Sequence, residues 1–137
     1  MARVRRVTLN PAGMRRLVHD PSTPTYRQMQ RIGAAILVAS AARAPRRSGR
    51  LAASGRYSMR PRYPKLTTRV GFYTRYAWWA HEGRGPVHAK PGGVLRWVDR
   101  GGRVRYATRV GPARGTPFLR QGTKAVTGKT PRRRRGN

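Results

Sequence analysis

The chain of 137 residues is long enough for one domain with a modest core, but not for two. It carries 32 lysines and arginines against only three acidic residues, a net charge of +29, so we expect it to work beside nucleic acid, a membrane surface or acidic proteins. Cysteine is absent, which excludes disulfides and thiolate metal sites.

The N-terminal part of the chain predicts a basic arm followed by a short helix. Residues 1–9 are basic, with apolar positions that fit a short strand or an arm. Asn10 and Pro11 then provide a helix cap and a first helical residue, so a short helix should run to about Val18. Residues 20–24 contain two prolines and end this helix.

The clearest helix is expected from about Thr25 to Arg43. Apolar or small residues recur there at spacings of three and four, as on the buried face of an amphipathic helix. These residues are Met29, Ile32, Gly33, Ile36, Leu37 and Ser40. Polar residues lie off this stripe, and several alanines favour close helical packing. The helix should end at Ala44, because the residue before a proline is disfavoured in the helical conformation.

The middle of the chain predicts a hairpin and a single helical turn. A helical turn at Leu51 should pass into a strand that ends near Arg60. Residues 66–73 alternate between apolar and polar side chains and fit the second strand, after a loop at residues 61–65. The aromatic segment that follows fits one turn of helix closed by Gly83.

The last part of the chain predicts a second hairpin and a final helix. Residues 83–93 are rich in glycine and proline and fit a loop. Residues 94–98 and 103–110 fit strands joined by a turn, with another loop after them. Pro117 should open a helix to about Val126, followed by a basic tail that buries nothing. The fold class is therefore α+β: one long helix packed on a small antiparallel sheet, with short N- and C-terminal helices and a basic tail.

Enzyme chemistry has few groups to work with in this chain. General acid–base catalysis usually needs two carboxylates or a histidine with a partner, and the three acidic residues lie far apart in the sequence. His81 and Glu82 do not make a zinc-protease signature, because no histidine stands at position 85. His19 and His88 would meet them only by coincidence. The sequence therefore predicts no enzyme activity, no metal and no cofactor.

No segment has the character of a membrane span or a signal peptide. The longest weakly apolar stretch, residues 33–42, is too short to cross a bilayer. Residues 1–10 are charged and lack the apolar segment of a secretion signal. We therefore expect no membrane partner, and a protein that works inside a cell or in a particle assembled there.

Basic residues are most concentrated in three segments of the chain, which are candidates for contact with DNA or with acidic neighbouring subunits. The candidate residues are Arg3, Arg5, Arg6, Arg46, Arg47, Arg50, Arg132, Arg133, Arg134 and Arg135. The last four could also face only water. Four aromatic residues interleaved with arginine could stack on single-stranded nucleic acid, although packing in the core or at a subunit interface is the simpler interpretation. These are Tyr63, Tyr73, Trp78 and Trp79, beside Arg62 and Arg75.

Three motifs occur in order along the chain. The first motif is a helix that ends in Ala-Pro and is followed by Ser-Gly-Arg-Leu, with a serine three residues after the leucine. The second is a strand with Val-Gly, followed by Tyr-Ala and then His-Glu-Gly. The third is Pro-Phe-Leu at the start of a helix. The motif residues are Ala44, Pro45, Ser48, Gly49, Leu51, Ser54, Val70, Gly71, Tyr76, Ala77, Glu82, Gly83, Pro117, Phe118 and Leu119. Over roughly residues 25–126 the chain thereby resembles the HK97 gp10-like family of phage neck, head–tail connector and tail-completion proteins.

The resemblance leaves residues 1–24 as a basic arm with a short helix, and residues 127–137 as an Arg-rich tail. Two positions depart from the family pattern. Residues 46–48 read Arg-Arg-Ser where the family usually has Val-Asp-Thr, and Gly122 stands near a usual alanine. Glu82, one of only three acidic residues, is expected to pair with an arginine of its own or the next subunit.

The resemblance implies a structural subunit of a ring at the head–tail junction of a tailed phage, acting in the neck, as a terminator or in tail completion. The implied partners are identical subunits in a ring, six by the family's expectation. Adjacent head-closure or adaptor proteins and tail-tube proteins would flank the ring, and packaged DNA would pass through it with non-specific contacts. Such a protein is assembled in the bacterial cytoplasm and located in the virion. The alternative is a ribosomal or nucleoid-type nucleic-acid-binding protein, which the small size and the charge also fit.

Overall fold

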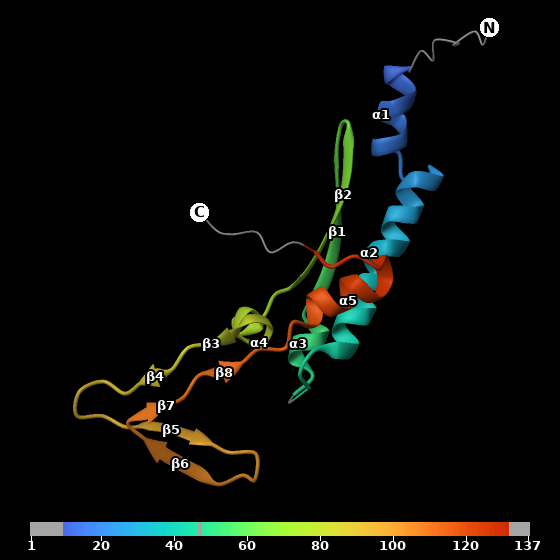
Figure 1. Cartoon of the computed structure of the whole chain (residues 1–137). Helices are drawn as coiled ribbons and strands as arrows, with labels where there is room; N and C mark the ends of the chain where they lie inside the picture. The colour runs from blue at the N-terminus through green and yellow to red at the C-terminus, as the bar shows by residue number, and fades with distance from the viewer. Residues whose placement is uncertain (1–9, 47, 132–137) are drawn as a thin grey trace, which may run out of the picture.

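The computed structural model describes residues 10–46 and 48–131, and these residues form the α+β fold that the sequence predicts. Two helices, α1 (Pro11–His19) and α2 (Pro24–Arg43), make a long bent rod along one side of the molecule. A β-hairpin and the last helix, α5 (Phe118–Thr127), lie against α2, and a narrow β-arm leads away from them (Figure 1).

Both long helices begin where their caps predict. The Asn10 side-chain oxygen accepts hydrogen bonds from the backbone N–H groups of Ala12 and Gly13, at 3.0 and 3.3 Å. Thr23 caps α2 in the same way, by accepting from the backbone N–H of Tyr26 at 3.4 Å. Each cap satisfies backbone donors that have no partner in the first turn of a helix.

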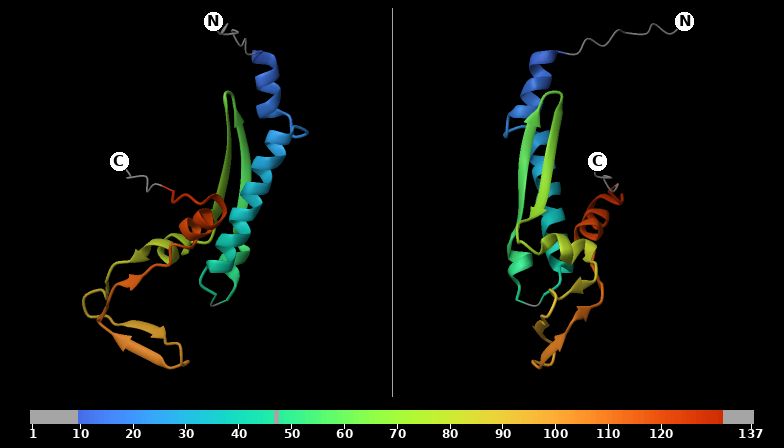
Figure 2. Two further views of the ribbon diagram at one scale, coloured as in Figure 1. Left: turned by 45° about the vertical axis from the view of Figure 1, so that its right-hand side comes forward. Right: turned by 90° about the vertical axis from the view of Figure 1, so that its left-hand side faces the viewer.

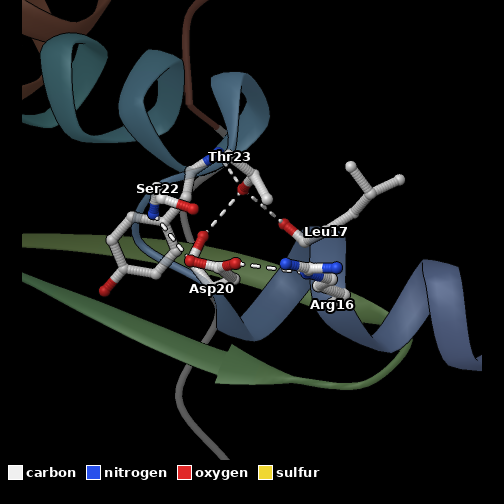
Figure 3. Close-up of polar contacts among 6 residues, drawn as sticks. Arg16, Leu17, Asp20, Ser22 and Thr23 are labelled. Carbon is white, nitrogen blue, oxygen red and sulfur yellow. Dashed lines mark hydrogen bonds and ion pairs between the residues drawn. The ribbon is translucent and has the colours of Figure 1, made fainter.

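The bend between α1 and α2 is held by polar contacts around Asp20 (Figure 3). Its Oδ1 accepts from the backbone N–H of Ser22 at 2.8 Å, and Arg16 Nε lies 3.4 Å from its Oδ2. The Thr23 hydroxyl lies 2.8 Å from the Asp20 carbonyl oxygen and 3.2 Å from that of Leu17. These contacts fix the angle at which the chain enters the second helix.

The hairpin is formed by β1 (Gly55–Arg62) and β2 (Lys65–Phe72), which a short helix, α3 (Arg50–Ala53), joins to α2. The strands are antiparallel from the pair Gly55–Phe72 to the pair Arg62–Lys65. The prediction of a loop over residues 61–65 is therefore wrong, because both strands continue up to a turn of two residues, 63 and 64. A proline is tolerated at position 61 because a strand in a two-stranded ribbon has a free edge to which its nitrogen can be directed.

The inner face of the hairpin packs on the stripe that the sequence places on α2. Gly33 is buried under the hairpin, Ser40 is buried against Gly122 of α5, and the other stripe residues are half-buried. At Gly33 an added Cβ would lie only 2.4 Å from Thr68 Cγ2, so the absence of a side chain lets β2 lie directly on the helix.

The arm, residues 83–115, follows the short helix α4 (Ala77–Glu82), and it runs away from the helices in all three views (Figures 1 and 2). Three successive antiparallel pairs build it: β3–β8, β4–β7 and β5–β6. Their bounds are β3 Gly83–Arg84, β4 Val87–His88, β5 Leu95–Val98, β6 Val104–Ala107, β7 Arg109–Val110 and β8 Ala113–Arg114. The loops expected at residues 83–93 and after residue 110 thus contain short strands, which are too brief to show a periodic pattern.

Two glycines bring the two sides of the arm together at its base. Gly83 has φ +91°, which favours glycine, and a Cβ there would meet the carbonyl oxygen of Ala113 at 2.6 Å. A Cβ on Gly115 would lie 2.2 Å from the Gly83 nitrogen. The arm therefore leaves the body through a backbone-to-backbone contact that no larger residue fits.

The buried core lies where the C-terminal end of α2 meets α3, α4 and α5. Its buried members are Ala44, Leu51 and Phe118, with Phe72 among the half-buried residues packed on them. The Phe118 ring meets the Phe72 ring edge-on at a centroid distance of 5.0 Å. This core is small for a chain of 137 residues, and much apolar surface stays outside it.

Candidate functional site

The three motifs meet in this core. Ala44 and Leu51 come from the first motif, Ala77 from the second, and Phe118 and Leu119 from the third. They lie far apart in the sequence, yet the structure brings them into one cluster. These five motif residues therefore serve packing rather than an exposed reactive site, whereas Tyr76 of the second motif is 41% exposed.

The turn between α2 and α3 shows how the other residues of the first motif act. Gly49 has φ +71°, in the left-handed region that favours glycine, and it caps the start of α3. The Ser54 hydroxyl donates to the Leu51 carbonyl oxygen at 2.8 Å and closes the same short helix. Pro45 and Ser48 are exposed in the loop.

A carboxylate lies at the junction of α4 and α5. Glu82 Oε1 accepts from Arg120 Nη2 at 3.0 Å and lies 2.9 Å from His81 Nδ1. The side chains of Glu82 and His81 are 17% and 14% exposed, and that of Arg120 is 32% exposed. The expected pairing of Glu82 with an arginine is confirmed within the chain. The pair links the base of the arm to the last helix.

The histidines do not gather around this carboxylate. His19 lies at the end of α1, and His88 lies in the arm. Across residues 10–46 and 48–131, no group of three or more His, Cys, Asp or Glu side chains is placed to hold a metal ion. What the Glu82 cluster offers chemically is a helix-to-helix clamp.

The other two carboxylates also have cationic partners inside the chain. Asp99 Oδ2 lies 2.9 Å from Arg105 Nε, and its Oδ1 accepts from the backbone N–H of Gly101 and Arg103. The hydrogen bond from Arg105, followed by that from the Arg103 backbone, lowers the pKa of Asp99. The pKa of Asp20 is lowered too, first by hydrogen bonds from Ser22 and then by Arg16.

The runs of arginine proposed as DNA contacts are described only in part. Arg46 and Arg50 are exposed, in the loop after α2 and at the start of α3. Arg46 lines a hollow together with Trp97 and Arg100 of the arm. The remaining candidates lie outside the described residues: Arg3, Arg5, Arg6, Arg47, Arg132, Arg133, Arg134 and Arg135. Their contact with DNA stays a prediction.

Sequence reasoning missed a basic surface on the hairpin, here named the basic ribbon. It consists of the outward-facing residues Arg56, Ser58, Arg60, Arg62, Lys65, Thr67 and Arg69. Their cations are mostly separated by apolar or hydroxyl residues, so a search for consecutive charges passes over them. The signal that finds them is the alternation of exposed and half-buried residues along both strands.

The aromatic residues beside α4 are exposed rather than packed in the core. Tyr73, Trp78 and Trp79 are 72%, 66% and 57% exposed. The physical reason is that α4 packs through the small side chains of Ala77 and Ala80, which turns both tryptophans outward. Core packing was therefore the wrong interpretation for these three, while an interface or a stacking role stays a prediction.

Tyr63 stands apart from that group at the tip of the hairpin. Its side chain is 40% exposed, and the Arg15 guanidinium lies 5.6 Å from its ring centroid. Further apolar residues are exposed along the arm, with Val94 and Tyr106 each 62% exposed. Exposed apolar residues therefore lie in two regions, here named the α4 surface (Tyr73, Trp78 and Trp79) and the arm surface (Val94 and Tyr106).

Among the described residues, no helix is both long enough and apolar enough to cross a membrane. Comparison of the chain with known protein families, with characterised proteins and with solved structures finds no match. The surfaces and contacts described above are thus the starting point for assigning a function.

Proposed function

We propose that this protein is a structural subunit of a homo-oligomeric ring at the head–tail junction of a tailed phage, through which DNA passes. The observation that carries the proposal is the amount of surface that the folded chain leaves open. The accessible area is 11883 Å², whereas a compact monomer of 15.4 kDa exposes about 7200 Å².

The excess leaves room for the two interfaces of a ring subunit. The sixteen residues outside the described ranges account for at most about 3000 Å² at the value for an extended chain, so the 121 described residues expose at least about 8900 Å². A compact monomer of 121 residues exposes about 6500 Å², which leaves an excess of about 2400 Å². A standard interface takes about 800 Å² from each partner, so contacts with two neighbours fit within this excess.

The chemistry of the open surface supports contact with a second copy. Tryptophan and tyrosine are enriched at the centres of protein interfaces, and large exposed apolar patches mark such sites. The α4 surface and the arm surface are different patches on one chain. A contact between the arm of one copy and α4 of the next is heterologous, and heterologous contacts form a ring when the rotation between successive subunits closes.

The three ordered motifs support the phage assignment specifically. They resemble the neck and tail-completion family, and in this chain they build one core. That resemblance proposes head-closure or adaptor proteins and tail-tube proteins as further partners, with DNA contacted non-specifically and no enzymatic role. The net charge of +29 also supports the alternative of a ribosomal or nucleoid-type nucleic-acid-binding protein.

Native mass measured across protein concentrations, at high salt, tests the proposal. We expect a discrete mass near six subunits for the wild-type protein. Replacing Trp78 and Trp79 by serine, or Val94 and Tyr106 by serine, should give folded monomers. Val38→Ser, a 69% exposed apolar position on α2, is the matched control and should still assemble.

Two results would contradict the ring. A wild-type chain that stays monomeric and coats nucleic acid without closing would replace it by the ribosomal or nucleoid-type alternative. A ring that survives both double variants, with circular dichroism showing intact folding, would remove the arm and α4 from the interface.

A further inference from the structure

The basic ribbon is a face of the molecule with one chemical character. Five of its residues are cations, and the other two, Ser58 and Thr67, carry hydroxyls. The right-hand view of Figure 2 shows the hairpin in front of α2, with no helix or strand of the described part covering it. Phosphate oxygens accept hydrogen bonds from all of these side chains.

The core determines which side of the hairpin is basic. Tyr57, Met59 and Leu66 on the opposite side are half-buried. Because side chains alternate along a strand, a shift by one residue would bury the cations and expose the apolar residues. The pairing brings the outward residues of the two strands side by side: Ser58 with Arg69, Arg60 with Thr67, and Arg62 with Lys65.

The length of the ribbon suits a nucleic-acid backbone. Each strand has eight residues, so at about 3.4 Å per residue the ribbon is about 27 Å long. Duplex DNA rises about 3.4 Å per base pair, so the ribbon spans about eight base pairs. Cations two residues apart, such as Arg60 and Arg62, are about 7 Å apart along the strand and can reach separate phosphates.

Among the ion pairs described for residues 10–46 and 48–131, none joins a carboxylate to these cations. Asp20, Glu82 and Asp99 are each paired with an arginine elsewhere in the fold, and no described ion pair involves the ribbon. Five like charges on one hairpin repel one another until an anion lies against them. An array of phosphates meets that need better than a single small anion, because its charges are spaced along the same direction.

We propose that the basic ribbon binds the phosphate backbone of double-stranded DNA without reading its sequence. Asparagine, glutamine and carboxylates, which read adenine and cytosine edges, are absent from this face. Arginine forks bind phosphate oxygens in pairs, and four of the five cations are arginines. The choice of duplex DNA rests on the proposed function, in which DNA passes through the ring.

The test compares two triple variants that remove equal charge. Arg60→Gln, Arg62→Gln and Arg69→Gln remove three ribbon cations, while Arg96→Gln, Arg100→Gln and Arg103→Gln remove three exposed cations of the arm. Binding to a fluorescent duplex of random sequence is measured by anisotropy over a salt series. The slope of log K against log salt should fall by about 2.7 for the ribbon variant, because each phosphate contact contributes about 0.9.

The arm variant should lose less than a third of that slope, and a ribbon triple with lysine in place of arginine should keep most of it. Circular dichroism checks that each variant is folded. If the glutamine triple is not folded, the three single Arg→Gln variants are measured instead, and each should lower the slope by about 0.9. Equal losses in the ribbon and arm variants would overturn the proposal, as would tighter binding to a single strand or to an acidic protein than to the duplex. Native mass, measured in parallel, separates the two proposals. If the protein forms no ring but its DNA binding depends on the ribbon cations, only the ring proposal is rejected. If the protein forms a ring but its DNA binding does not depend on the ribbon cations, only the ribbon proposal is rejected.

Discussion

At Gly122, α5 comes so close to α2 that a side chain has no room. A Cβ at this position would lie 2.1 Å from Ser40 Oγ and 2.7 Å from the Ser40 backbone nitrogen. Ser40 is itself fully buried. A small residue on each helix therefore allows the close crossing of α2 and α5.

We predict that Gly122→Ala destabilises the fold although alanine favours helix. Forcing a methyl group into a packed contact costs about 1–3 kcal/mol, more than the gain of up to about 1 kcal/mol in helix propensity. Urea unfolding measures the change. Gly13→Ala on α1 is the control: its Cβ would be no closer than 3.8 Å to a neighbour, so it should stabilise the protein. Equal stabilisation by both substitutions would contradict the close crossing.

Glu82→Gln tests the clamp between α4 and α5. The substitution keeps the size of the side chain and removes the charge that faces the Arg120 guanidinium, which is about two-thirds buried. We expect a loss of about 1.5–3 kcal/mol in the free energy of unfolding, the range for hydrogen bonds to charged groups. Asp99→Asn removes a more exposed pair and should cost less, and a larger loss for Asp99→Asn would show that the clamp is not a principal contact.

At the scale of elements, the sequence predicts the helices well and the short strands poorly. α1, α2 and α5 have caps, prolines and apolar spacings that repeat over several turns, so their ends lie within about two residues of expectation. β3, β4, β7 and β8 have two residues each, and no period can show in so short a segment. Their pairing depends on the tertiary approach of Gly83 to Gly115.

The sequence also predicts some features of the candidate sites and misses others. The Glu82 pair could be expected because an acidic residue is rare in this chain, but its partner Arg120 is 38 residues away and only the fold identifies it. The alternation of apolar and polar side chains on β2 predicts a strand, and the same alternation places the basic ribbon on one face of that strand. The sequence does not show the register in which β1 pairs with β2. That register places the cations of both strands on one face of the hairpin.

The turns at Asp20 and Asp99 predict a dependence of stability on acid. Both carboxylates have a pKa below the ordinary value of 3.8, so their contribution is complete above that value and is lost as the pH falls through the folded pKa. We expect the melting temperature to fall as the pH drops below about 4, and to fall less in the double variant Asp20→Asn, Asp99→Asn. An identical fall in both proteins would show that these two turns are not responsible.

At the scale of the whole molecule, the two proposals predict opposite responses to salt. Apolar contacts between subunits that each carry +29 should strengthen as salt screens their repulsion. DNA binding should weaken over the same range, because it releases condensed counterions. Light scattering and anisotropy on one salt series check both. Assembly that weakens with salt in step with DNA binding would mean that charge, rather than the apolar surfaces, joins the subunits.

The ion pairs of the three acidic side chains have a consequence for what surrounds the protein. Because Asp20, Glu82 and Asp99 each pair with an arginine of their own chain, the surplus of +29 is left for other anions to balance. Six copies carry about +174, while the duplex that a ribbon spans, about eight base pairs, carries about sixteen phosphates. Enclosed DNA would therefore neutralise only a small fraction of such a ring, and salt ions and acidic protein neighbours would balance the rest. If the proposed ring forms, the surfaces of the layers stacked above and below it should be rich in aspartate and glutamate.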